Sequence, residues 1–251
     1  METTTPIIRI IEEGTSTNIL LNEWIKEEQV SEGSVLAARS QTAGKGQKGN
    51  SWHSEPGENL TFSMILYPRS ISIQAQFIIS QIVSLAVKQV IDPYVQGVSI
   101  KWPNDIYVGE RKIAGILIEN NLSGRTIDSC IIGIGLNVNQ KSFPDTLPNP
   151  ISLYQLTQQR ADLDRLLQTL QQTIYTDYLR FLADPNKKAA IQQAFHMALF
   201  RREGLFPYFD RKNNELIMAR IENVAPNGTL SLRLENGTIR NYQFKEVEYI
   251  L

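Results

Sequence analysis

The sequence of 251 residues has few of the residues that build a disulfide or metal scaffold. It contains one cysteine, Cys130, and two histidines, His53 and His196, that are far apart in the chain. A single cysteine excludes an internal disulfide and fits a reducing compartment. Two separated histidines without a cysteine cluster argue against a zinc site. Cys130 lies within a predicted buried strand, so we interpret it as core filler rather than as a nucleophile.

The sequence also lacks a strong charge imbalance and a long apolar run. Its formal net charge is −1, which gives no electrostatic footprint for bulk nucleic-acid binding. No apolar run approaches the roughly 20 residues that span a membrane. The N-terminus has neither the basic start nor the apolar core of a signal peptide. We therefore expect a cytoplasmic globular protein whose partners include no DNA and no membrane.

The most informative segment is a loop rich in glycine and lysine. It reads Gln41-Thr-Ala-Gly-Lys-Gly-Gln-Lys-Gly-Asn-Ser-Trp52 and follows a predicted strand at 35–38. Glycines let backbone N–H groups approach an anion, and lysines supply mobile positive charge. The segment therefore favours a phosphate-bearing ligand, with an ordinary solvated surface loop as the alternative.

Two familiar phosphate-binding motifs do not fit this loop. Residues 44–49 spell G-x-G-x-x-G, but the dinucleotide motif requires a helix directly after it. Here Pro56 and Gly57 are followed by an alternating, strand-like run at 59–66. A Walker A motif would need a lysine where Asn50 stands, and it also requires a following helix. We reject both interpretations.

Three further segments have the composition of a ligand site. Residues 101–119 predict a strand, a Pro-Asn-Asp turn, a short strand and a tight turn that leads into a strand with Lys112 at its start. Residues 130–139 predict a buried strand interrupted by two glycines, where a ligand or another backbone can approach closely. The hydroxyl cluster at 15–18 precedes an amphipathic helix, and each member also suits a simple N-cap.

In this order and at these separations, the four segments resemble the biotin–protein ligase family. The loop resembles the family's G-R-G-R-x-G-R-x-W signature, and residues 101–106 are similar to its K-W-P-N-D-[IL] motif. Residues 112–119 are similar to its R-K-[IL]-A-G-I-L-[IV]-E strand, and residues 133–139 to its G-x-G-[IL]-N segment. The resemblance is strong over about residues 10–140 and looser beyond them.

The resemblance implies an ATP-dependent ligase that uses Mg²⁺ with ATP. Such an enzyme first activates biotin as biotinyl-5'-AMP and then transfers it to a lysine of a biotin carboxyl carrier domain. A lipoate–protein ligase is one alternative, although its R-R-x-x-G-G-G motif is absent here. A non-catalytic biotin-binding protein is another, because a fold does not determine a function. The short segment before Thr15 predicts the monofunctional form, without the DNA-binding domain of regulatory members.

The resemblance also implies roles for individual residues. The predicted catalytic residues are Lys112, Lys45 and Asp105, with Asp105 as the expected Mg²⁺ ligand. The predicted biotin-binding residues are Ser16, Thr17, Asn18, Gln41, Lys112, Gly115, Gly133 and Gly135. The predicted residues for ATP and the adenylate are Lys45, Gly46, Gln47, Lys48, Trp52, Asn104 and Asn137. Gln47 departs from the family, because relatives carry there an arginine that holds the adenylate with a charged, forked contact.

The predicted fold is α+β, with a mixed-sheet catalytic domain at 1–199 and a small SH3-like β-barrel at 200–251. In the first domain we expect strands near 7–11, 35–38, 60–67, 98–102, 106–108, 112–119 and 131–139. Helices are expected at 18–28, 72–91, 162–182 and 187–199, with a Pro-rich loop at 142–150. Hairpin signals at Asn227-Gly228 and Asn236-Gly237 separate short strands in the second domain, at 216–224, 229–234, 238–244 and 246–250. The resemblance implies that this domain covers the active site and helps to engage the acceptor. Both a monomer and a homodimer remain open.

Overall fold

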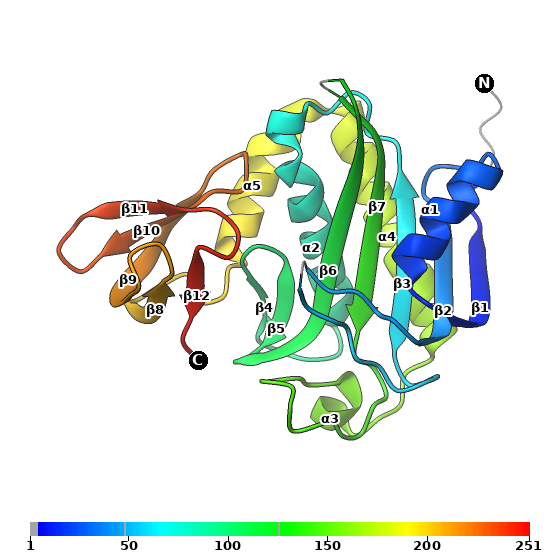
Figure 1. Ribbon diagram of the computed structural model, residues 1–251, viewed down its shortest axis with the longest axis horizontal. Coiled ribbons are helices and arrows are strands. Elements are labelled where there is room, and N and C mark those ends of the chain that lie inside the picture. Colours follow the sequence, from blue (N-terminus) through cyan, green and yellow to red (C-terminus); the bar gives the residue numbers. More distant parts are fainter. Residues whose placement is uncertain (1–4, 48, 125) are drawn as a thin grey trace.

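A computed structural model describes residues 5–47, 49–124 and 126–251 (Figure 1). Within these residues the chain forms one seven-stranded mixed sheet and one five-stranded antiparallel sheet. The larger sheet has the order β1-β2-β3-β7-β6-β5-β4. Its strands are β1 (Ile8–Gly14), β2 (Val35–Gln41), β3 (Leu60–Leu66), β4 (Val98–Lys101), β5 (Asp105–Val108), β6 (Arg111–Ser123) and β7 (Thr126–Leu136).

The larger sheet is mixed because β1 runs parallel to β2, whereas β2, β3, β7, β6, β5 and β4 pair antiparallel in turn. Every residue of β3 is buried, as expected for a central strand covered on both faces. The long β6–β7 pair aligns Gly115 with Gly135 and Leu117 with Gly133. This register brings the glycines that the sequence singles out to neighbouring positions in the middle of the sheet.

Helices cover both faces of the larger sheet (Figure 1). On one face α1 (Thr17–Glu27) packs Leu21 and Trp24 against a small cluster of strand residues, namely Leu36, Ile65 and Ile131. On the other face lie α2 (Phe77–Ile91), α4 (Leu163–Ala183) and α5 (Lys188–Met197), which share the main hydrophobic core. A short helix, α3 (Leu153–Thr157), and two 3₁₀ turns at 73–75 and 185–187 complete the described helices. None of these helices is both long and apolar enough to cross a membrane.

The smaller sheet is the C-terminal module, defined here as β8 (Phe206–Asp210), β9 (Glu215–Val224), β10 (Leu230–Leu234), β11 (Ile239–Tyr242) and β12 (Val247–Tyr249). Its order is β11-β10-β9-β8-β12. Gly228 and Gly237 have φ values of +89° and +87°, the left-handed conformation that tight hairpin turns require and glycine adopts readily. The predicted hairpins are therefore confirmed, and the closure of the sheet into a barrel stays a prediction.

Aromatic contacts join the C-terminal module to the larger sheet. The Trp102 indole N–H donates to the Gly228 carbonyl at 2.9 Å, and the ring centroids of Trp102 and Phe244 are 5.3 Å apart. Phe77 of α2 also contacts Phe244, with a centroid distance of 6.1 Å. One hydrophobic core runs across the expected boundary at 199/200. The division into two domains therefore stays a prediction.

The α+β class and the mixed sheet are confirmed, and helix α3 and strand β8 are among the elements that were not predicted. Helix α3 begins with a capping box, in which Ser152 accepts from the Gln155 backbone and the Gln155 side chain accepts from the Ser152 backbone. The S-x-x-Q pattern is a sequence signal for this helix start. Strand β8 follows Gly204 and mixes aromatic residues with a proline, so its alternation is not apparent without its partner β9.

The buried charge of the C-terminal module is Asp210. Its carboxylate accepts hydrogen bonds from the Tyr242 hydroxyl at 2.7 Å, Asn213 Nδ2 at 2.8 Å and Arg240 at 2.9 Å. Burial by itself raises the pKa of Asp210, but these hydrogen bonds outweigh it and lower the pKa to about 2. The ionised group therefore stabilises the fold above the ordinary carboxyl pKa of about 4, and this contribution is lost as the pH falls from about 4 to about 2.

We expect Asp210→Asn to lower the free energy of unfolding at pH 7 by about 2–3 kcal/mol, because it places an amide donor against three donors. The variant should also lose less stability than wild type between pH 4 and pH 2. Urea unfolding at pH 7, 4 and 2 measures both effects. Asp128→Asn is the matched control, since Asp128 is exposed and pairs with Arg69 at the surface. Equal stability of the two variants at pH 7 would contradict this role for Asp210.

Candidate active site

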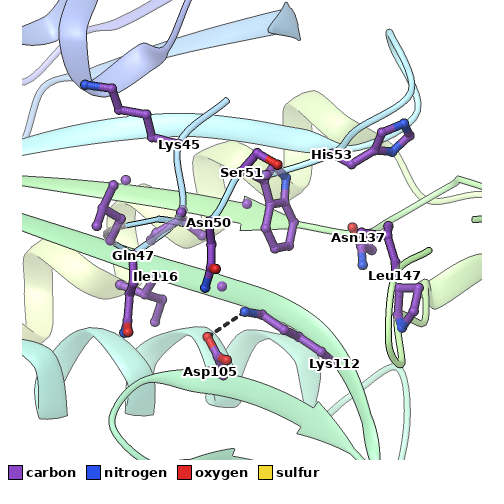
Figure 2. Close-up of a pocket in the computed structure, with 18 of the residues that line it drawn as sticks. Lys45, Gln47, Asn50, Ser51, His53, Asp105, Lys112, Ile116, Asn137 and Leu147 are labelled. Carbon is purple, nitrogen blue, oxygen red and sulfur yellow. Dashed lines mark ion pairs between the residues drawn. The ribbon is translucent and has the colours of Figure 1, made fainter. Parts of the chain in front are cut away.

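A cavity of about 480 Å³ lies beside the middle of the larger sheet, among β6, β7, the start of α1 and the loop after β2. Its volume is within the range of about 300–1,000 Å³ that is typical of small-molecule sites. Figure 2 shows side chains from these segments around it. Every predicted site residue that the structure describes lines the cavity, except Asn104. Lys48 lies outside the described residues.

Hydroxyl and amide groups form one end of the cavity. The Gln41 side-chain oxygen accepts from the Thr17 backbone N–H at 2.8 Å. The Ser63 hydroxyl lies 2.7 Å from Thr17 Oγ1 and 2.6 Å from Asn18 Oδ1. Asn18 Nδ2 donates to Glu119 at 2.6 Å. These bonds hold the side chains of the α1 start in fixed positions beside the cavity, with donors and acceptors for a polar group.

The position of Ser16 decides whether the hydroxyl cluster at 15–18 binds a ligand or only caps helix α1. It occupies the N-cap position of α1 with extended backbone angles, yet its side chain makes no capping hydrogen bond. The residue is only 2% exposed and lines the cavity. A buried hydroxyl normally has a hydrogen-bond partner. The Ser16 hydroxyl is therefore better placed to contact a ligand than to cap the helix.

Glycines form the floor of the cavity because side chains lie directly against their backbone. A Cβ atom on Gly133 would overlap Asn18 Oδ1, and one on Gly135 would overlap the indole ring of Trp52. A Cβ on Gly115 would lie 3.0 Å from Trp52 and 3.1 Å from the Lys112 side chain. The sequence predicted a close approach at these positions. The structure identifies Asn18 and Trp52 as the groups that approach.

A lysine–aspartate pair stands at the other end of the cavity. Lys112 Nζ lies 2.8 Å from Asp105 Oδ1, and the two side chains are 30% and 25% exposed. Figure 2 shows this pair pointing into the space beneath the loop, with the Asn50 side chain directed toward it. Lys112 Nζ is also 5.7 Å from the centroid of the Trp52 ring. The sequence motifs thus bring one cation and one carboxylate into contact at the cavity.

The glycine- and lysine-rich loop forms a hairpin above the cavity. Gly46 N–H donates to the Asn50 carbonyl at 3.0 Å, and Trp52 N–H donates to the Gly44 carbonyl at 2.9 Å. Gln47 Nε2 donates to Asn104 Oδ1 at 3.1 Å, which is how Asn104 connects to the site. Lys45 is exposed, and Figure 2 shows its side chain extending away from the Lys112–Asp105 pair.

Two buried polar atoms at the cavity have no hydrogen-bond partner among the described residues. These are Asn137 Oδ1 and Trp52 Nε1. The Asn137 side-chain amide donates to the Ile151 carbonyl at 3.1 Å, so its orientation is determined while its oxygen stays available. Because buried polar atoms are normally paired, one acceptor and one donor here are suited to a ligand.

The Pro-rich segment contributes cavity residues that the sequence did not reveal. Phe143, Leu147, Pro148, Asn149 and Pro150 all line the cavity. The segment is held against β6, since Lys112 N–H donates to the Asn149 carbonyl at 2.8 Å and Ile151 N–H donates to the Lys112 carbonyl at 2.9 Å. Phe143 and Leu147 each directly precede a proline, and such large apolar residues are a signal in themselves, because a solvated loop seldom needs them. Asn50, Ser51, His53, Ile116, Leu117 and Ile134 are further lining residues that were not predicted.

The described part of the chain contains no group of three or more histidine, cysteine, aspartate or glutamate residues arranged for a metal ion. Asp105 is the acidic residue among those described at the cavity wall. Mg²⁺ keeps several waters and binds proteins through one or two carboxylates plus the substrate's phosphates. One carboxylate beside a lysine therefore fits an ion that arrives with a nucleotide, and not a site that the protein provides alone.

Comparisons with known proteins agree with this geometry. A model of the "Biotin/lipoate A/B protein ligase family" matches residues 10–137. The bifunctional ligase/repressor BirA of Bacillus subtilis is 36% identical over 156 residues, which cover 59% of this chain and 47% of BirA. The Escherichia coli BirA is 32% identical over 199 residues, covering 78% of this chain and 55% of the relative. The chain thus spans about half the length of these curated relatives.

The fold is also similar to solved structures over nearly the whole chain. The biotin protein ligase from Aquifex aeolicus, solved in complex with biotin and ATP, has a TM-score of 0.79 and 25% sequence identity. The match covers 98% of this chain and 100% of that one. The family match extends from β1 through β7 and includes the hairpin, Asp105, Lys112 and the glycine floor. This chain therefore belongs to the biotin/lipoate A/B protein ligase family.

Proposed function

We propose that this protein activates biotin with ATP as biotinyl-5'-AMP and transfers the biotinyl group to a lysine of a biotin carboxyl carrier domain. The order of groups along one cavity supports this most directly: buried hydroxyls and amides, a glycine floor, then the Lys112–Asp105 pair. Biotin presents a matching order of a polar ureido ring, an apolar chain and a carboxylate. The similarity to a ligase solved with biotin and ATP adds independent support.

In the first step an oxygen of the biotin carboxylate attacks the α-phosphorus of ATP. A new P–O bond forms, the bond to the β-phosphate oxygen breaks, and pyrophosphate leaves with the electron pair. Negative charge spreads over the phosphoryl oxygens in the transition state, so positioning and electrostatic stabilisation matter most. We assign this neutralisation chiefly to Lys112, which lies at the cavity end opposite the hydroxyl cluster. Lys45 and backbone N–H groups of the hairpin, which lie above the cavity, would contact the phosphates.

In the second step the amine of the acceptor lysine attacks the carbonyl carbon of the mixed anhydride. The C–N bond forms, the bond to the phosphate oxygen breaks, and AMP leaves while the amine loses a proton. The C-terminal module lies beside β4 and β5 (Figure 1), and β5 begins at Asp105. This placement is compatible with a role in engaging the carrier domain. The proposal includes a catalytic domain at 1–199, the module at 200–251 and a cytoplasmic location.

Mg²⁺ belongs to the proposal as the ion that accompanies ATP. Asp105 is the residue that would hold it, together with the phosphates. When bound, the ion would supply positive charge that reduces repulsion among the phosphate oxygens. Asn137 Oδ1, which has no partner among the described residues, is suited to accept from the amino group of adenine, and the family resemblance places Asn137 among the residues that bind ATP and the adenylate.

Two alternatives make different predictions. A lipoate–protein ligase would share the fold and the adenylation step but take a different acid. A non-catalytic biotin-binding protein would bind biotin without turnover. Biotin-dependent exchange of labelled pyrophosphate into ATP separates the three. We expect exchange with biotin and none with lipoate. Exchange only with lipoate would support the first alternative, and biotin binding without exchange would support the second.

We expect Asp105→Asn to lower the rate of biotinyl-AMP formation by about tenfold, because Lys112 keeps its charge but loses the charged partner that positions it. The Mg²⁺ concentration for half-maximal rate should rise as well if Asp105 holds the ion. Glu110→Gln is the matched control, since Glu110 lies in the turn at the other end of β5, pairs with Arg201 and does not line the cavity. A wild-type rate for Asp105→Asn across a Mg²⁺ titration would contradict both roles.

A further inference from the structure

One carboxylate that lies outside the cavity is bonded to a residue of the cavity wall. Glu119 is an exposed residue of β6 and is not among the residues that line the cavity. Its Oε2 accepts from Asn18 Nδ2 at 2.6 Å. Asn18 is only 4% exposed and does line the cavity. A charged acceptor thus holds a buried amide, and hydrogen bonds to charged groups are among the stronger ones in proteins.

This bond determines which way the Asn18 amide is turned. An ionised carboxylate only accepts hydrogen bonds, so the amide must direct its NH₂ group toward Glu119. The Asn18 oxygen is thereby directed at Ser63, a fully buried residue whose hydroxyl lies 2.6 Å away. An amide oxygen has no proton to donate. The Ser63 hydroxyl must therefore donate its single proton to Asn18.

The same count of protons extends to Thr17. Ser63 Oγ also lies 2.7 Å from Thr17 Oγ1, a distance at which one hydroxyl donates to the other. Because the Ser63 proton is used on Asn18, the Thr17 hydroxyl donates to Ser63. Thr17 Oγ1 then has only lone pairs left for a ligand. This relay, which runs from Glu119 through Asn18 and Ser63 to Thr17, makes the Thr17 hydroxyl an acceptor toward the cavity.

Gln41 adds a donor beside this acceptor. Its side-chain oxygen accepts from the Thr17 backbone N–H at 2.8 Å, so its NH₂ group is the part left for a ligand. Gln41 and Thr17 both line the cavity. A cyclic urea has the complementary order, an N–H beside a C=O. The disulfide ring of lipoate has no N–H group and would leave the acceptor unpaired, which is a costly mismatch in a buried site.

We propose that Glu119 is a positioning residue that sets the hydrogen-bond polarity of Thr17, so that the cavity selects a ligand whose ring carries an N–H group. Glu119 acts through Asn18 and Ser63, without contact to the ligand. This inference rests on the proposed function in naming biotin as that ligand. The direction of the relay is a property of the ligand-free chain.

Replacing the acceptor at position 119 by a donor tests this polarity. Glu119→Lys should turn the Asn18 amide, so that Ser63 accepts from Asn18, donates to Thr17 and leaves the Thr17 proton for the ligand. The probes are biotin and its cyclic carbonate isostere, in which oxygen replaces both ureido N–H groups. We expect wild type to prefer biotin by about 100-fold, and Glu119→Lys to lower this preference about tenfold. Glu119→Gln retains an oxygen acceptor and should keep most of the preference.

The ratio of the two affinities separates this role from a structural one, because loosened packing would weaken both ligands alike and leave the ratio unchanged. Glu28→Lys is the matched control. Glu28 is another exposed carboxylate, it accepts from the buried Trp24 indole N–H of α1 at 2.9 Å, and it does not line the cavity. This variant should keep the wild-type ratio. An unchanged ratio in Glu119→Lys, or an equal change in Glu28→Lys, would overturn the proposal.

A measurement without biotin separates the relay from the proposed function. Hydrogen exchange of the Asn18 side-chain amide, followed by NMR in the ligand-free protein, reports its bond to Glu119. Glu119→Ala should speed this exchange about tenfold, as for the loss of one hydrogen bond to a charged group, and Glu28→Ala should not. Unchanged exchange in Glu119→Ala overturns the relay even if the protein biotinylates a carrier. Faster exchange in a protein that binds no biotin supports the relay and refutes only the proposed function.

Discussion

Lys112→Ala is expected to slow biotinyl-AMP formation by about 10²–10³-fold, the usual effect of removing one transition-state electrostatic contact. Lys112 Nζ pairs with Asp105 at the cavity, and its backbone is hydrogen-bonded on both sides to the Pro-rich segment. The substitution removes this charge and leaves the Asp105 carboxylate facing the phosphates. Single-turnover measurement of pyrophosphate release reports the step directly.

Further variants separate this role from a general effect of lysine charge. Lys112→Arg should restore only part of the rate, because a planar fork does not replace a compact ammonium. Lys141→Ala is the matched control, since Lys141 is an exposed lysine that contacts Tyr154 outside the cavity. Pre-formed biotinyl-AMP should rescue transfer in Lys112→Ala to a large extent. Normal pyrophosphate release in Lys112→Ala would refute the assignment.

Gly135→Ala is expected to weaken biotin binding by about 10–100-fold, in line with an overpacking cost of about 1–3 kcal/mol. The added methyl group would overlap the Trp52 indole, and the Trp52 backbone is tied to Gly44 in the hairpin. The ring must therefore move into the cavity or carry the hairpin with it. Isothermal titration with biotin measures the change, with circular dichroism as a check on folding.

Gly115→Ala provides a graded comparison for this prediction. Its methyl group would lie 3.0 Å from Trp52 and 3.1 Å from the flexible end of Lys112. A shift of a few tenths of an ångström relieves such contacts, so we expect a loss of affinity of only a few fold. If Gly135→Ala bound biotin as tightly as Gly115→Ala, the close approach of Trp52 would have no role in shaping the site.

The sequence motifs predicted the residues at the two ends of the cavity well, because the residues at each end come from one continuous segment of the chain. Lys112 and Asp105 belong to a single strand–turn–strand unit, and the structure brings them to 2.8 Å. The glycines at 115, 133 and 135 signalled a close approach, but a glycine does not specify its neighbour. Asn18 and Trp52 approach from other elements, and their positions follow from the packing of α1 and the hairpin on the sheet.

Contacts between segments that are distant in the chain could not be predicted in this way, because no sequence pattern marks the two partners. The Gln47–Asn104 bond joins residues 57 positions apart, and neither amide indicates its partner in the sequence. The Pro-rich segment was predicted as a loop, and it is one, but its apolar side chains have no periodicity that would point to a cavity. Phe143 and Leu147 line the site because the segment pairs with β6 beside Lys112.

The central claim is that the one cavity with Lys112 at its end supports transfer of biotin to a carrier protein. Incubation of the protein with biotin, Mg²⁺, ATP and a biotin carboxyl carrier domain, followed by intact-mass spectrometry of the carrier, tests it most directly. We predict a mass increase of one biotinyl group that requires both biotin and ATP. The increase should disappear when the acceptor lysine of the carrier is replaced and should be strongly reduced in Lys112→Ala. An unmodified carrier in the presence of wild-type protein that binds biotin would contradict the account.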